Sequence, residues 1–233
     1  MPKAPSLIEI ITRCFDDDTY SDLTITCRDR SWKVHRVVVC PQSRVLNAAC
    51  MTGFKEAQTG IVDLDDDDPA AVETMLRFFY TGKYIEPANE SGEIRFEIRI
   101  AILIYILADK YDVSALMDLA EKSFKRLLSV SLTEEDYLSA VSDVYTLPLP
   151  TNALKAITVE HARRKFRGML QGSKSDLVQN ALLQIPEFAV DVILVFVNTP
   201  LRGRCYSCGP DQTAEALQAR CVKCGKGGIS LTD

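Results

Sequence analysis

The stretch that decides the fold runs from Tyr20 to Tyr84 and reads YSDLTITCRDRSWKVHRVVVCPQSRVLNAACMTGFKEAQTGIVDLDDDDPAAVETMLRFFYTGKY. Polar and apolar residues alternate over positions 22–27, which is the period of a half-buried strand. A turn over residues 28–31 leads into a return strand that begins at Trp32, and residues 61–64 predict another short strand. Residues 34–40 lead into a short helix, and a second short helix precedes Phe54. The stretch therefore combines a small sheet with short helices.

A longer helix that follows this sheet has clear signals at both ends. Asp68 can accept bonds from free N–H groups of the first turn, Pro69 stands where a missing N–H costs nothing, and Gly82 follows the last turn. Between them, apolar residues recur at helical spacing, namely Val72, Met75, Leu76, Phe79 and Tyr80. These positions predict a helix over residues 69–81 with one apolar face.

Most of the remaining chain is predicted to be helical. An amphipathic segment over Leu7–Phe15 predicts a short helix, and helical periodicity continues over residues 95–108 and 113–128. Thr133 and Asp136 have the spacing of a capping box at the start of a further helix. Two or three more helices follow to about residue 197. The fold class is therefore α+β and predominantly α.

Composition limits the class of protein. The 233 residues are 47% hydrophobic and 25% charged, as in an ordinary soluble globular protein. The net charge of −5 argues against nucleic acid as the dominant partner of the whole chain, although residues 151–233 hold 11 Lys/Arg against 7 Asp/Glu. The most apolar stretch, Ile98–Ala108, is shorter than the roughly 20 residues that cross a bilayer, so we expect a buried helix and no membrane partner.

The cysteines indicate the compartment. The chain holds eight cysteines, and its first residues, MPKAP, lead into an amphipathic segment and not into the apolar core of a secretory signal. Free or metal-bound thiols persist in reducing compartments. We therefore expect a cytoplasmic or nuclear protein.

Several short signals, taken in this order, resemble the BTB/POZ family. They are Ser-Asp-Leu at the strand start, Val-His-Arg before the short helix, the Asp-Pro-capped helix that ends in Phe-Tyr-Thr-Gly-Lys-Tyr, and Leu-Ala-Asp-Lys-Tyr-Asp at 107–112. The resemblance covers residue 6 to about 128. It implies a BTB/POZ fold, a small sheet flanked by helices, in a protein-interaction module with no chemistry of its own. The whole chain resembles fungal-type BTB proteins with a helical extension.

Breaks in the pattern divide the chain further. Leu147-Pro148-Leu149-Pro150 interrupts the helices, and Asn198-Thr199-Pro200 precedes a cysteine-bearing tail. We predict a BTB/POZ domain over residues 6–128, a helical extension over 129–199 and a tail over 200–233.

The resemblance also implies structural roles. Asp22 and Arg36 match the family's charged pair beneath the dimer groove, where opposite charges offset each other's desolvation. His35 has no nucleophile partner in the sequence, so a structural histidine that holds the turn into the helix is favoured over a catalytic base. Homodimerisation through the Leu7–Phe15 helix is expected. It would be weaker than in the family's long form, because only six residues precede Leu7 and the exchanged strand of that form has no counterpart here.

Phe54-Lys55-Glu56 resembles the hydrophobic-x-Glu motif with which BTB adaptors engage the cullin scaffold of ubiquitin ligases. In that interpretation Phe54 anchors in a pocket of the partner and Glu56 pairs with a basic rim. The alternative is a loop in which Phe54 packs back on its own domain. The chain shows no kelch or MATH domain, so an adaptor of this kind would recruit substrates through its helices or its tail.

The tail contains the only motif with coordination chemistry of its own. Cys205-x2-Cys208 and Cys221-x2-Cys224 are 12 residues apart, and a glycine follows each pair. Paired thiolates at this spacing bind one tetrahedral Zn²⁺, and a closed four-sulfur site is structural because no position is left for a catalytic water. The alternatives are two unrelated pairs of surface thiols or a redox pair. We predict one structural zinc ion.

The sequence leaves two functions open. The first is a non-enzymatic adaptor or scaffold that recruits a cullin ubiquitin ligase. The second is a nuclear, transcription-associated zinc protein whose tail contacts DNA or chromatin, because Arg202, Arg204, Arg220, Lys223 and Lys226 surround the knuckles. No recognition helix or aromatic platform is evident in the sequence. An enzyme is not expected, because the chain lacks a phosphate-binding glycine-rich loop and its two histidines have no partner motif.

Overall fold

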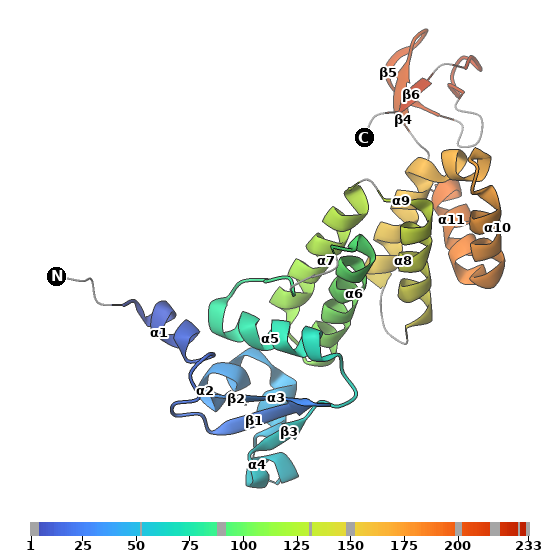
Figure 1. Ribbon diagram of the computed structural model, residues 1–233. Coiled ribbons are helices and arrows are strands. Elements are labelled where there is room, and N and C mark those ends of the chain that lie inside the picture. The colour runs from blue at the N-terminus through green and yellow to red at the C-terminus, as the bar shows by residue number, and fades with distance from the viewer. Residues whose placement is uncertain are drawn as a thin grey trace. The chain divides into compact units, whose positions relative to one another are not determined.

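A computed structural model describes residues 5–51, 53–87, 92–130, 132–147, 152–198, 202–214, 220–227 and 229–231. The chain divides into two compact units, Met1–Val130 and Ser131–Asp233, and each is described by itself (Figure 1). The sequence breaks at Pro148, Pro150 and Thr199–Pro200 lie outside the described residues. The domain boundaries after residues 128 and 199 stay predictions.

The first unit contains a three-stranded sheet with the order β2-β1-β3. The central strand β1 (Leu23–Cys27) pairs antiparallel with β2 (Arg30–Val34) and parallel with β3 (Ile61–Asp63). Its burial alternates as the sequence predicts. The return strand begins two residues before Trp32, because Arg28 takes a left-handed conformation (φ 55°) that closes a tighter turn.

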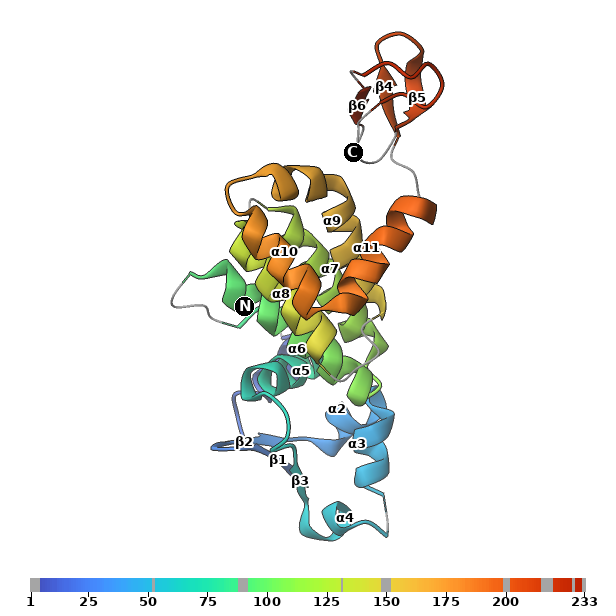
Figure 2. The same ribbon diagram turned by 90° about the vertical axis from the view of Figure 1, so that its right-hand side faces the viewer.

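Apart from α4, which was not predicted, the helices of the first unit lie close to their predicted positions. They are α1 (Leu7–Arg13), α2 (Arg36–Val39), α3 (Arg44–Ala49), α4 (Lys55–Thr59), α5 (Pro69–Thr81), α6 (Ile94–Lys110) and α7 (Ser114–Ser129), with a 3₁₀ turn at Cys40–Gln42. Figures 1 and 2 both show α4 beside β3, and α6 alongside α7. The apolar stretch Ile98–Ala108 lies within α6 and is largely buried, as expected.

Helix α5 forms the centre of this unit. Asp68 Oδ1 accepts hydrogen bonds from the backbone N–H groups of Ala70 (2.9 Å) and Ala71 (3.2 Å). Gly82 ends the helix in a left-handed conformation (φ 64°), which glycine adopts without steric cost. Its apolar face is fully buried and α1, α2 and α6 contact it. The predicted helix and both of its end signals are confirmed.

The second unit begins with four helices that contact one another: α8 (Glu134–Thr146), α9 (Asn152–Gln171), α10 (Ser175–Gln184) and α11 (Pro186–Asn198). Thr133 caps α8 by accepting from the Asp136 N–H, as its spacing predicts. The core of these helices includes Tyr137, Leu154 and Phe188. Among the described residues no single helix has the length and apolar composition to cross a membrane. Helices α10 and α11 meet that test only as a pair, and they are bent by 107° at their junction.

The tail forms its own small sheet with the order β5-β4-β6. Strand β4 (Arg202–Cys205) lies between β5 (Gly209–Thr213) and β6 (Ile229–Leu231), and both neighbours are antiparallel to it. Among the tail residues whose side chains the structure describes, the buried ones are Gly203, Cys205, Ala214 and Cys221. Small domains commonly need a disulfide or a bound metal for stability.

Candidate interaction and metal sites

Phe54 stands at the start of a helix, which corrects the expectation that the Phe54-Lys55-Glu56 motif lies in a loop. Phe54 occupies the N-cap position of α4 in an extended conformation, and Lys55 and Glu56 form the first turn. Gly60 ends the helix in a left-handed conformation (φ 67°). A helix of five residues is too short to show an apolar periodicity, so the sequence gives no signal for it.

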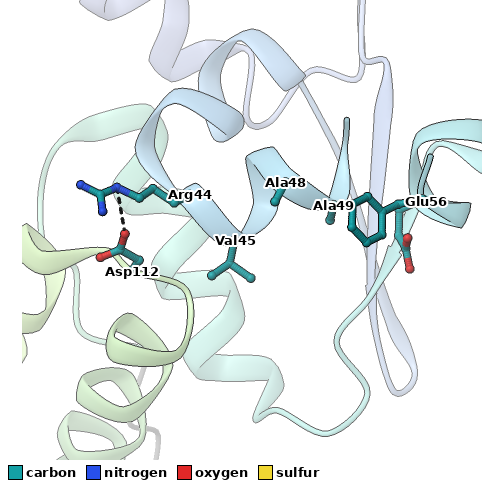
Figure 3. Close-up of a pocket in the computed structure, with 7 residues that line it drawn as sticks. Arg44, Val45, Ala48, Ala49, Glu56 and Asp112 are labelled. Atoms are coloured by element: carbon teal, nitrogen blue, oxygen red, sulfur yellow. Dashed lines mark ion pairs between the residues drawn. The ribbon is translucent and has the colours of Figure 1, made fainter. Parts of the chain in front are cut away.

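A shallow groove of about 470 Å³ lies next to this motif. It is lined by Arg44, Val45, Ala48 and Ala49 of α3, by Phe54 and Glu56, and by Asp112. Figure 3 shows Val45, Ala48 and Ala49 along one side of α3, with Arg44 and Asp112 at one end and Glu56 at the other. Arg44 Nε and Asp112 Oδ2 are 3.3 Å apart. The groove thus has an apolar floor between an ion pair and a single acid.

The Phe54 side chain faces solvent. It is 55% exposed although it lines the groove, whereas an aromatic residue packed back on its own domain would be largely buried. Phe54 is therefore not a buried residue of its own domain. An exposed aromatic ring beside an apolar groove is typical of a protein-interaction site.

Asp22 and Arg36 are joined by a hydrogen bond from the Arg36 backbone, and the described structure shows no ion pair between their side chains. Asp22 Oδ1 accepts the backbone N–H of Arg36 at 2.7 Å, at the start of α2, where N–H groups lack partners within the helix. The Arg36 guanidinium turns instead toward the Ala57 carbonyl, with Nη2 at 3.5 Å. Asp22 directly precedes β1, Arg36 belongs to α2 and Ala57 belongs to α4. These two contacts therefore link the sheet to the helix that Phe54 begins.

His35 is buried and both of its ring nitrogens are occupied. Nε2 lies 2.9 Å from the Thr19 carbonyl, which can only accept, so Nε2 carries the proton. Nδ1 then accepts from the Tyr80 hydroxyl at 2.8 Å, and that same hydroxyl accepts the His35 backbone N–H at 2.9 Å. The interpretation of His35 as a structural residue is confirmed.

Helix α1 presents two faces. One packs on α5, where Thr12 Oγ1 donates to the Tyr80 carbonyl at 3.2 Å and the Phe15 ring lies 5.2 Å from the Tyr80 ring. The other face exposes Leu7, Ile8 and Ile10. Three neighbouring large apolar side chains in solvent form a surface that a second protein can cover.

The four cysteines of the tail converge. Their Sγ atoms all lie within 4.8 Å of one another, and Cys205 and Cys224 Sγ are 3.8 Å apart. A tetrahedron of Zn–S bonds of about 2.3 Å has sulfur–sulfur edges of about 3.8 Å, whereas a disulfide holds its sulfurs at about 2.05 Å. Gly209 (φ 92°) and Gly225 (φ 67°) supply the left-handed turn after each pair. The donor set therefore fits one zinc ion.

The electrostatics of the cluster also favour a cation. The backbone N–H groups of Ser207 and Cys208 lower the pKa of the Cys205 thiol to about 7. A side-chain hydrogen bond with the Cys224 thiol, and then burial, raise the pKa of the Cys208 thiol to about 12, because both favour its protonated form. A divalent cation among the four sulfurs would favour the thiolate form of all four.

Comparison with known proteins agrees with this architecture. The model of the BTB/POZ domain matches residues 11–128. The chain belongs to the BTB/POZ family. The predicted fold class is confirmed, and BTB domains are protein-interaction modules.

Individual relatives share this region. The BTB and MATH domain-containing protein 42 of Caenorhabditis elegans is 28% identical over 160 residues, which are 66% of this chain and 37% of that protein. The Kelch repeat and BTB domain-containing protein 4 of Homo sapiens is 23% identical over 121 residues, which are 52% of this chain and 21% of that protein. The BTB domain of zebrafish PATZ1 is 10% identical, with a TM-score of 0.41, and the match covers 54% of this chain and 99% of the PATZ1 chain. The chain thus spans well under half the length of these two curated relatives.

Several groove residues were not predicted as functional. Arg44, Val45 and Ala48 belong to no local motif, and Asp112 belongs only to the fold signal at 107–112. They come from segments up to 68 positions apart, so only the packed structure brings them together with Phe54.

Proposed function

We propose that this BTB protein is a non-enzymatic adaptor or scaffold that binds a cullin scaffold of a ubiquitin ligase through Phe54, Glu56 and the adjoining groove. The observation that carries the proposal is the exposed Phe54 ring at the edge of an apolar groove, with Glu56 on its rim. The resemblance of this motif to the cullin-binding motif of BTB adaptors supports it.

The chemistry of the groove defines what the partner must offer. An apolar side chain of the partner fills the floor along Val45, Ala48 and Ala49, and the exposed part of Phe54 becomes buried. Complete burial of a phenylalanine side chain contributes about 1.5–3 kcal/mol, so burying the exposed half contributes about 1 kcal/mol or more. A basic group of the partner pairs with Glu56, which affects association rate and partner choice more than affinity.

The tail adds a structural element to this scaffold. Cys205, Cys208, Cys221 and Cys224 would hold one Zn²⁺, and its binding would stabilise the folded tail. With four sulfur ligands the ion keeps no position for water, so its role is structural. A reducing cytoplasm or nucleus would keep these thiols available for the metal.

The exposed face of α1 suggests a second copy of the chain as a partner. Leu7, Ile8 and Ile10 form an uncharged surface that can pack against itself across a two-fold axis. Replacing Leu7 and Ile8 together by aspartate should convert a dimer to a monomer in sedimentation equilibrium. A wild-type protein that is monomeric throughout the micromolar range contradicts dimerisation through α1.

The adaptor proposal is tested by capture of a purified cullin. The Phe54→Ala/Glu56→Ala variant should lose affinity by about tenfold or more, because truncating a central aromatic contact costs more than 1 kcal/mol. Asp18→Ala/Tyr20→Ala is a matched control, since it removes an acid and a fully exposed aromatic residue at the same spacing elsewhere in the unit. The proposal fails when wild-type protein captures no cullin, or when both variants bind equally well.

A further inference from the structure

Helix α11 exposes an apolar stripe on the side opposite its buried face. Phe188 and Val192 are buried where α11 packs on the other helices of its unit. Four large apolar side chains recur along the other face at positions i, i+3, i+4 and i+7, and each is between 49% and 72% exposed: Val190, Ile193, Leu194 and Val197. A helix that is apolar all round is normally covered on every side, so this stripe is a surface for a partner.

The charged groups beside the stripe are satisfied within the chain. Glu187 pairs with Lys155 at 2.7 Å, and Asp191 accepts the Tyr145 hydroxyl at 2.7 Å. The stripe itself holds no charge, so its partner must offer apolar side chains and needs no basic group. Helix α11 also contains no lysine or arginine, whereas helices that lie on membrane surfaces are rich in both along their polar face. The complementary partner is therefore a protein surface that is apolar and uncharged, like the stripe itself.

We propose that the partner is a second copy of this chain, with the two α11 helices packed antiparallel about a two-fold axis between Ile193 and Leu194. The stripe is symmetric about that axis, so Val190 of one copy meets Val197 of the other, and Ile193 meets Leu194. The two Glu187 carboxylates then lie about 20 Å apart along the helices, beyond the Debye length of about 8 Å. Parallel pairing would set them side by side. Antiparallel pairing also places each helix N-terminus beside the C-terminus of the other, which the helix dipoles favour.

The size of the stripe indicates a reversible contact. A fully exposed side chain of this kind carries on the order of 100 Å² of apolar surface, so the four together expose on the order of 250 Å² per copy. A pair of copies would cover about twice that area, which is less than the about 1,200 Å² that stable complexes bury. We therefore expect association that depends on concentration. It is independent of the α1 surface and of cullin binding.

Cysteine crosslinking of the full chain tests the register. Val190→Cys chains and Val197→Cys chains, one of them carrying a size tag, are mixed and treated with oxidised glutathione. The new cysteines lie opposite each other only between the two variants, so the mixture should form several times more disulfide-linked heterodimer than either variant forms homodimer. Within a homodimer the two Cα atoms would be about 11 Å apart, beyond the about 7 Å that a disulfide spans. Wild-type chain, with its eight native cysteines, gives the background.

Sedimentation equilibrium at about 0.1–1 mM, above the micromolar range in which α1 is tested, measures the association itself. The starting chain is Leu7→Asp/Ile8→Asp, so that the α1 surface contributes nothing. Adding Ile193→Asp should weaken self-association by about tenfold or more, because a charge without a partner would be buried in the contact. Leu177→Asp, at an exposed leucine of α10, is the matched control and should leave self-association unchanged.

The outcomes separate this proposal from its alternatives. Val190→Cys homodimers as abundant as the mixed heterodimers would show a parallel or unspecific contact and overturn the antiparallel pair. A mixture that crosslinks no more than wild-type chain overturns the second copy as the partner, and so does a starting chain that stays monomeric up to about 1 mM. Equal effects of Ile193→Asp and Leu177→Asp place the contact elsewhere and overturn it as well. None of these results changes whether Phe54 and Glu56 capture a cullin.

Discussion

Removing the Tyr80 hydroxyl tests the hydrogen-bond network that organises the first unit. This one oxygen accepts the His35 backbone N–H and donates to His35 Nδ1, at 2.9 and 2.8 Å. Tyr80 is buried, and burial raises the pKa of its phenol to about 12, so it stays a neutral donor at all ordinary pH values. The Tyr80→Phe substitution keeps the ring and its packing against Phe15 but leaves two polar groups of His35 without a partner.

The magnitude follows from those two groups. A buried donor or acceptor left unsatisfied costs about 1–3 kcal/mol, so two of them should lower the free energy of unfolding by about 2–6 kcal/mol. With a urea m value of about 2 kcal/mol per molar for a unit of this size, the unfolding midpoint should fall by about 1–3 M.

The chain offers a selective probe for this measurement. Its single tryptophan, Trp32, lies on β2 of the same unit, so urea unfolding followed by tryptophan fluorescence reports on this unit alone. Tyr20→Phe is the matched control, because the Tyr20 side chain is 92% exposed and its hydroxyl should contribute less than about 0.5 kcal/mol. A Tyr80→Phe midpoint equal to that of the control would show that the network does not stabilise the unit as described.

Three further predictions concern the helix cap, the metal and a half-buried histidine. Asp68→Ala removes the acceptor of two N–H groups and should lower the stability of the first unit by about 1 kcal/mol in the Trp32 assay, whereas the exposed neighbour Asp66→Ala should have no effect. Cys221→Ser should reduce bound zinc from one ion per chain to none by atomic absorption, without moving the Trp32 transition; retention of a full equivalent contradicts the site. His161 stacks on Tyr137 at 4.8 Å, and burial lowers its pKa from 6.5 to about 4. The unfolded chain therefore takes up this proton first, and the second unit should lose stability as the pH falls from about 6.5 toward 4; an NMR titration of His161 with a midpoint near 6.5 would contradict this.

Local features of the sequence were sufficient for several helices and for the central strand of the first sheet. The alternation over residues 22–27, the ends of α5 and the Thr133 cap depend on neighbours within four positions, and each appears in the structure as predicted. The spacing of Cys205, Cys208, Cys221 and Cys224 likewise predicts that the four thiols meet at one site, and the structure brings their sulfurs together. The motif at Phe54 was visible, but the helix that it begins was not.

What the sequence by itself determined was therefore most of the helices and the chemistry of the cysteine cluster, because caps, periodicity and paired thiols act over short distances along the chain. The BTB fold followed from the resemblance of its short signals to that family. Only the tertiary structure decided which surfaces are open to partners. The groove requires Arg44, Phe54 and Asp112 to meet, and the exposure of Phe54 depends on what packs around its ring. An aromatic residue has the same composition and periodicity whether it is buried or exposed, so its role depends on contacts between distant segments.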